Sequence, residues 1–261
     1  MAVALCLSLN VAHSTGWYDD HAPDLVRRYE AVDPASLHGW LTGLVPDPPG
    51  TVLDIGAGSG RDAAWFSAQG YDVIAVEPSS GMRSEGQRLH RDPRIRWISD
   101  QLPELSVLGP LAISFDLVMM TAVWQHVPPS QRDRAFRKIA ALVRSGGLLA
   151  ISLRSGPSPA GSGMHPVSLK EVERLSRNHG FAVEKVQQAP DQQGRAEVSW
   201  TCVALRLPDE EPARCRCSAT SSSMTRRAPP TSSAYSAPSV GPQIALPEWF
   251  KTPGTSSCAF R

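Results

Sequence analysis

The chain has 261 residues, 41% of them hydrophobic and 20% charged, which is typical of one globular domain. Its 26 Lys and Arg residues are balanced by 25 Asp and Glu residues, so net charge gives no case for nucleic acid or an anionic membrane as the main partner. No run reaches the roughly 20 apolar residues of a membrane helix, and the five cysteines suggest no disulfide framework.

The first 50 residues are expected to precede the core of the fold. Residues 1–15 contain an apolar stretch without a basic start or a good cleavage site, which predicts a disordered terminus rather than an export signal. Over residues 16–50 apolar side chains such as Leu25, Tyr29 and Trp40 recur at near-helical spacing, and the proline-rich residues 46–50 end the pattern. We therefore predict a helical cap over residues 16–50. Since no export signal is expected, we also predict a cytoplasmic location.

Residues 51–60 read TVLDIGAGSG, an apolar strand that ends in an acid and three alternating glycines. Such glycines let the backbone turn sharply and approach a ligand at the start of the next helix. A dinucleotide-binding fingerprint needs a further glycine at position 61, where this chain has Arg61. Asp54 would repel a phosphate but could hold a cationic ammonium group. The loop thus indicates an amino-acid-bearing nucleoside as the ligand.

The elements that follow alternate between strands and helices. Strands are predicted over residues 71–76, 94–98, 115–120, 148–153, 181–186 and 198–207. Helix starts are predicted at Ser79, at a capping pair formed by Ser130 and Asp133, and at a second pair formed by Ser168 and Glu171. The helix that begins at the first pair is expected to end at residues 146–147. This alternation predicts an α/β fold with a mostly parallel sheet covered on both faces.

The tail, residues 208–261, is rich in Ser, Pro, Ala and Arg and has no sustained apolar period, which predicts disorder. Its texture is also compatible with translation through a shifted reading frame, or with a flexible arm that binds a partner. Cys215 and Cys217 have no further ligands nearby, so no metal site is predicted.

The pattern of residues 51–60 closely resembles motif I of the class I S-adenosylmethionine (SAM)-dependent methyltransferases, and the resemblance extends over roughly residues 17–207. It implies a three-layer Rossmann-like sandwich whose seven-stranded sheet is mostly parallel with one antiparallel strand. It also implies SAM as the cofactor, bound by a domain over residues 51–207.

The resemblance further implies which residues bind SAM. The glycine loop would wrap the amino-acid part of SAM, Glu77 at the end of the second strand would hold the ribose, and the residues after the third strand would meet the adenine. In chain order the expected cofactor residues are Asp54, Gly56, Ala57, Gly58, Gly60, Glu77, Pro78, Asp100, Gln101 and Thr121.

Residues 115–128 resemble motif IV of the small-molecule members of this family. Trp124 or His126 would then lie near the methyl acceptor, and His126 could accept a proton there or simply hydrogen-bond a loop. Tyr18 and Tyr29 of the cap could close over the cofactor or be buried packing residues.

We therefore predict an enzyme that methylates an oxygen, nitrogen or carbon atom of a small molecule. The Asn/Asp-Pro-Pro-Tyr pattern of DNA amine methylation is missing, which disfavours a nucleic-acid partner. Two alternatives remain open: an NAD(P)-binding oxidoreductase of related fold, and a module that binds SAM without catalysis.

Overall fold

The computed structural model describes residues 2–209, with side chains from residue 15 onward. The tail predicted over residues 208–261 therefore lies, apart from Pro208 and Asp209, outside the described residues, as do Cys215 and Cys217.

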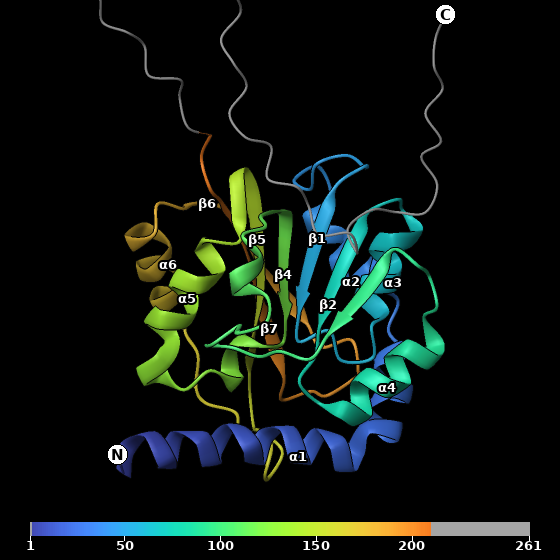
Figure 1. Ribbon diagram of the computed structural model, residues 1–261, viewed down its shortest axis with the longest axis vertical. Coiled ribbons are helices and arrows are strands. Elements are labelled where there is room, and N and C mark those ends of the chain that lie inside the picture. The colour runs from blue at the N-terminus through green and yellow to red at the C-terminus, as the bar shows by residue number, and fades with distance from the viewer. Residues whose placement is uncertain (1, 210–261) are drawn as a thin grey trace, which may run out of the picture. The chain divides into compact units, whose positions relative to one another are not determined.

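A seven-stranded sheet forms the centre of the domain (Figure 1). Its strands are β1 (Thr51–Ile55), β2 (Asp72–Val76), β3 (Ile95–Ile98), β4 (Phe115–Thr121), β5 (Val143–Ser155), β6 (Ala182–Pro190) and β7 (Ser199–Arg206). They lie in the order β3-β2-β1-β4-β5-β7-β6, and β7 runs antiparallel to both of its neighbours while the other pairs are parallel. The predicted sheet with one antiparallel strand is confirmed.

Helices follow the strands as the alternation predicts. The α-helices are α1 (Ala2–Glu30), α2 (Pro34–His38), α3 (Arg61–Ala68), α4 (Ser80–Leu89), α5 (Arg132–Ala140) and α6 (Leu169–Asn178). Short 3-10 turns cover Gly39–Leu41, Gly109–Leu111, Trp124–His126 and Pro129–Gln131. Helices α3 and α4 lie beside the β1–β3 half of the sheet, and α5 and α6 lie beside the other half (Figure 1). None of the helices among residues 2–209 is both long and apolar enough to cross a membrane.

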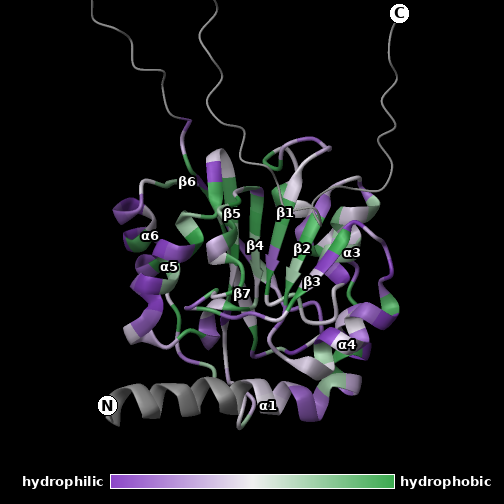
Figure 2. Ribbon diagram, in the orientation of Figure 1, coloured by the Kyte–Doolittle hydropathy of each residue, from purple (hydrophilic) through white to green (hydrophobic). Residues whose placement is uncertain are grey.

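The central strands form the hydrophobic core. Val52, Leu53, Leu117 and Val118 are fully buried in β1 and β4, and hydrophobic residues dominate the middle of the sheet in Figure 2. Near-continuous apolar strands of this kind are expected where both faces of a parallel sheet are covered.

Helix α1 is longer than the predicted cap. It begins at Ala2, inside the 1–15 segment that the sequence suggested would be disordered. A helix that is already nucleated extends at little cost through good helix formers, and this segment is rich in Ala and Leu. The domain boundaries themselves remain predictions.

The C-terminal half of α1 contacts the start of α4 through Asp19. One oxygen of this carboxylate, Oδ1, accepts hydrogen bonds from the Ser79 hydroxyl at 2.7 Å, the Ser80 hydroxyl at 3.2 Å and the Gly81 amide at 2.8 Å. Ser79 Oγ in turn accepts from the Met82 amide, so the predicted N-cap at Ser79 is confirmed. Asp19 thus acts as a second N-terminal cap of α4, although it belongs to a different helix, α1.

Two sequence predictions about helix ends were wrong. No side chain caps α5, because a 3-10 turn of Pro129–Gln131 leads directly into it. The helix also ends at Ala140, and the glycines at 146–147 lie within β5, where Gly146 and Gly147 exchange backbone hydrogen bonds with Leu207.

The capping pair at α6 is half formed. Ser168 Oγ accepts from the Glu171 amide, but the Glu171 carboxylate accepts instead from Arg132 at 2.6 Å. This ion pair ties α6 to α5.

Candidate functional site

A cavity of about 390 Å³ lies at the carboxyl ends of the parallel strands. The ends of β1, β2 and β4 line it together with residues of α1, and the β6–β7 loop lines it as well. The order of strands reverses between β1 and β4, which is where open α/β sheets bind ligands. All of the predicted cofactor residues line this cavity except Gly60.

The glycine loop is held against β2 by its backbone. The amides of Gly56 and Ala57 both donate to the carbonyl of Val76, at 2.7 and 3.0 Å. Gly56 has a φ of +70°, and a Cβ there would lie 2.5 Å from Cγ2 of Val123. Only glycine meets both conditions, so the loop can follow this path only with glycine at position 56.

Gly60 lies outside the cavity lining and begins α3. Its φ is +83°, and a Cβ would lie 2.7 Å from the Trp97 ring. In this structure Gly60 allows the close approach of α3 and β3, whereas the other loop residues face the cavity.

Glu77 is buried at the end of β2 with its carboxylate turned back to the loop. One oxygen accepts from the Gly58 amide and the other from the Ser79 amide, each at 2.8 Å. A carboxylate has about four acceptor positions, so each oxygen keeps one for a ligand hydroxyl. Burial raises the pKa of Glu77 to about 7, and these two amides oppose the shift only in part.

This pKa predicts a pH dependence of cofactor binding. Ribose hydroxyls bind most strongly to the ionised carboxylate, which is the minor form below pH 7. We expect the affinity for S-adenosylhomocysteine to rise about tenfold from pH 6 to pH 8, measured by isothermal titration. The stability of the free protein should change in the opposite sense, because the pKa of Glu77 in the folded protein lies above the ordinary 4.5. This carboxyl contributes to the free energy of unfolding below pH 4.5, and that contribution is lost as the pH rises through 7.

The Glu77→Gln variant is the control, since an amide does not titrate in this range. An affinity that rises equally in the variant would assign the pH dependence to another group.

Asp100 also lines the cavity, but its carboxylate is fully used by its own loop. It accepts from the amides of Gln101, Ser106, Val107 and Leu108 at 2.8 to 3.0 Å. All four acceptor positions are therefore occupied, in contrast to Glu77. In this conformation Asp100 shapes the loop after β3 and has no position left for an adenine amino group.

Asp54 is 2% exposed, and its Oδ2 has no hydrogen-bond partner among the described residues. Burial, followed by the nearby Asp62, raises the pKa of Asp54 well above its usual range. Burial would likewise raise the pKa of Asp62, but His38 and Arg61 outweigh it and hold that pKa well below normal. An orphaned buried carboxyl beside an ionised one suits a cationic ligand group, so the residues fit the ammonium of SAM.

Tyr18 of α1 and His126 meet in the lining of the cavity. The Tyr18 hydroxyl lies 3.1 Å from His126 Nε2, and their rings pack edge to face. Burial lowers the pKa of His126 to about 4, so this imidazole is neutral at pH 7. Tyr29 packs over Gly58, where its ring lies 3.6 Å from the position that a Cβ would take. Both tyrosines are thus packing residues and cavity walls at once.

Of the two residues expected near the acceptor, Trp124 or His126, only His126 lines the cavity. Trp124 is fully buried, packs edge to face on Phe136 and lies outside the cavity lining. Thr121 does line the cavity, at the end of β4.

Sequence reasoning missed the residues from the β5–β7 side. Arg154, Asp191, Arg195 and Trp200 all line the cavity. Only Arg154 left a readable signal, because it is the one charged residue that closes the apolar run 148–153. Among residues 2–209, no group of His, Cys, Asp and Glu side chains is arranged to hold a metal ion.

The matching family model and the similar curated proteins all name methyltransferases. A family described as "Methyltransferase domain" matches residues 52–147. The demethylmenaquinone methyltransferase of Beutenbergia cavernae is 27% identical over 204 residues, which are 70% of this chain and 82% of that protein. The glycine N-methyltransferase of Rattus norvegicus is 29% identical over 135 residues, which are 46% of each chain.

Solved structures agree on the fold. The 1,6-didemethyltoxoflavin-N1-methyltransferase of Burkholderia thailandensis matches with a TM-score of 0.58 and 24% identity, over 76% of this chain and 88% of that one. The magnesium protoporphyrin IX methyltransferase of Synechocystis PCC 6803 with bound S-adenosylhomocysteine matches with a TM-score of 0.60 and 16% identity, over 76% and 99%. With this strand order and a glycine loop placed at its switch point, the chain belongs to the class I SAM-dependent methyltransferases.

Proposed function

We propose that this enzyme transfers the methyl group of SAM to an oxygen, nitrogen or carbon atom of a small molecule. One observation carries the proposal: a single cavity joins the glycine loop and Glu77 to Tyr18, His126 and Arg154. A cofactor and a small acceptor can therefore meet inside it. The relatives named for demethylmenaquinone, glycine and didemethyltoxoflavin support an acceptor that is neither a nucleic acid nor a protein. A cytoplasmic location stays a prediction.

The chain's own residues supply the cofactor contacts in this proposal. Asp54 faces the ammonium group, Glu77 accepts from the ribose hydroxyls with its two remaining positions, and the loop at residues 56–58 lies along the amino-acid part. For the adenine we favour Gln101 and Pro78 over the Asp100 side chain, because the acceptor positions of Asp100 are filled. Thr121 borders the cofactor from β4.

When bound, SAM would supply an activated methyl group: an electron pair of the acceptor would bond to the methyl carbon while the carbon–sulfur bond breaks, S-adenosylhomocysteine would leave, and the acceptor would lose a proton. The protein's task is then to align the acceptor and exclude water. A histidine with a pKa near 4 is a weak base at neutral pH. We therefore propose that His126 mainly orients the Tyr18 hydroxyl, and a role as general base remains a prediction.

The test is a parallel isothermal titration of the full chain with SAM, S-adenosylhomocysteine and NAD. Saturable binding of both sulfur nucleosides, with no heat from NAD, is the expected result. Binding of NAD alone would contradict the assignment of the cofactor site. Binding of SAM without turnover of any acceptor in a broad screen would favour a module that no longer methylates.

A further inference from the structure

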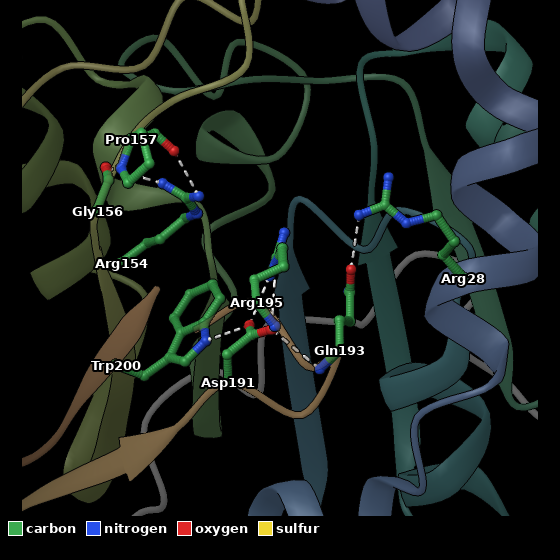
Figure 3. A network of polar contacts seen from close by, with 8 residues as sticks. All are labelled: Arg28, Arg154, Gly156, Pro157, Asp191, Gln193, Arg195 and Trp200. Carbon is green, nitrogen blue, oxygen red and sulfur yellow. Dashed lines mark hydrogen bonds and ion pairs between the residues drawn. The ribbon is translucent and has the colours of Figure 1, made fainter. Parts of the chain in front are cut away.

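Arg154 is a buried cation without an ion-pair partner among the described residues. It stands near the end of β5, is 9% exposed and lines the cavity. Its guanidinium donates only to backbone carbonyls, those of Gly156 at 3.2 Å and Pro157 at 2.7 Å (Figure 3). Three of its five N–H groups thus have no partner within the described chain. A buried charge of this kind is costly unless a ligand completes it.

The neighbouring acid is occupied elsewhere. Asp191 pairs with Arg195 through two hydrogen bonds, at 2.6 and 3.0 Å, and accepts from the Trp200 indole at 3.0 Å (Figure 3). Its carboxylate also accepts from the amides of Gln193 and Arg195. Asp191 therefore neutralises Arg195 and folds the β6–β7 loop, and it is not paired with Arg154.

The loop is also fixed from its other side. The Gln193 side chain accepts from Arg28 of α1 at 2.8 Å, which ties the β6–β7 loop to the helix that carries Tyr18. Arg154 pairs in register with Trp200 across β5 and β7. The guanidinium is thus held by a strand, with an indole as its neighbour, rather than by a free loop.

The cavity lining contains charged side chains of both signs. Arg154 and Arg195 line the cavity beside Asp191, whose single charge is taken up by its ion pair with Arg195, so this group of three carries an excess of one positive charge. Burial, then Arg195, lowers the pKa of Arg154, and Asp191 and Tyr18 oppose this shift only in part.

We propose, on the basis of the methyl transfer proposed above, that the acceptor is a small carboxylic acid whose carboxylate binds to Arg154. The planar guanidinium fork matches a carboxylate in two parallel hydrogen bonds, which an amide cannot form equally well. Trp200 and Tyr18 border the same space and offer apolar surface to the rest of the acceptor.

The experiment uses the full chain saturated with S-adenosylhomocysteine. Acetate, benzoate and phenylacetate are each titrated beside their amides, and binding is followed by ligand-observed NMR. We expect at least one acid to bind about tenfold or more tightly than its amide. In Arg154→Gln this preference should disappear while the affinity for S-adenosylhomocysteine changes less than about twofold, and Arg154→Lys should keep part of the preference.

Arg88→Gln is the matched control, because Arg88 is an exposed residue of α4 paired with Glu85. The carboxylate site is contradicted if no acid is preferred over its amide, or if the preference survives in Arg154→Gln. If Arg154→Gln does not fold, Arg154→Lys provides the test. Because lysine lacks the planar guanidinium, this variant must bind the acid more weakly than the wild type does and bind the amide with unchanged affinity. Failure of the wild-type protein to bind S-adenosylhomocysteine would instead contradict the methyl transfer itself.

Discussion

Replacement of Glu77 by Gln is expected to weaken binding of S-adenosylhomocysteine by about 100-fold or more, which corresponds to roughly 3 kcal/mol. The amide carries no charge and keeps only one acceptor oxygen, so the ribose hydroxyls lose charge-assisted bonds. In the wild type the amides of Gly58 and Ser79 both donate to the carboxylate, so the new NH₂ group of the variant must face one of these two donors. Isothermal titration of the purified variant measures the loss.

Glu85→Gln is the matched control for this change. Glu85 lies on α4 beyond the cavity lining and pairs with Arg88 in solvent, so its variant should bind S-adenosylhomocysteine as the wild type does. Unfolding in urea shows whether Glu77→Gln is folded under the titration conditions. A folded variant with unchanged affinity would remove Glu77 from the ribose site.

The second large effect is expected for Gly56→Ala, with a loss of about 3 kcal/mol in the free energy of unfolding. A non-glycine residue at a φ of +70° costs about 1–2 kcal/mol, and overpacking against Val123 adds about 1–3 kcal/mol. Cofactor affinity should fall as well, because the loop must shift. Urea denaturation gives the stability, and titration of the folded variant gives the affinity.

Two companion variants separate the causes. Gly43 has a φ of +78° and no atom within 4 Å of the position that a Cβ would take, so Gly43→Ala should show the backbone cost alone. The double variant Gly56→Ala/Val123→Ala should recover most of the packing part, seen as a favourable coupling in a double-mutant cycle. If Gly56→Ala is no more destabilising than Gly43→Ala, the contact with Val123 is not tight.

The order of strands and helices followed from the sequence because its signals are local. The apolar strand at 51–55 and the cap at Ser79 each depend on neighbouring residues. The end of α5 was mispredicted because residues 146–147 carry a turn signal, whereas their actual conformation is decided by pairing with Leu207, about 60 residues away. Long-range pairing leaves no local trace.

The site divides in the same way. Residues Asp54 and Glu77 stand directly beside the glycine loop or one strand later, so motif spacing finds them. Asp100 stands at an equally suggestive strand end, and only its four amide contacts distinguish a loop-shaping acid from a ligand-binding one. Arg154 could be recognised as a candidate site residue only from the structure, because the sequence does not show that Asp191 pairs with Arg195 and leaves Arg154 without an ion-pair partner among the described residues.

Asp19 links the two helices that frame the cofactor end of the cavity. Any swing of α1 wide enough to uncover Tyr18 withdraws Asp19 from α4 and leaves the Gly81 amide without its acceptor. Uncovering the cavity and fraying of the first turn of α4 are then one event. If a bound nucleoside leaves by this route, its release breaks the same contact, and hydrogen exchange at the Gly81 amide measures how often the contact opens.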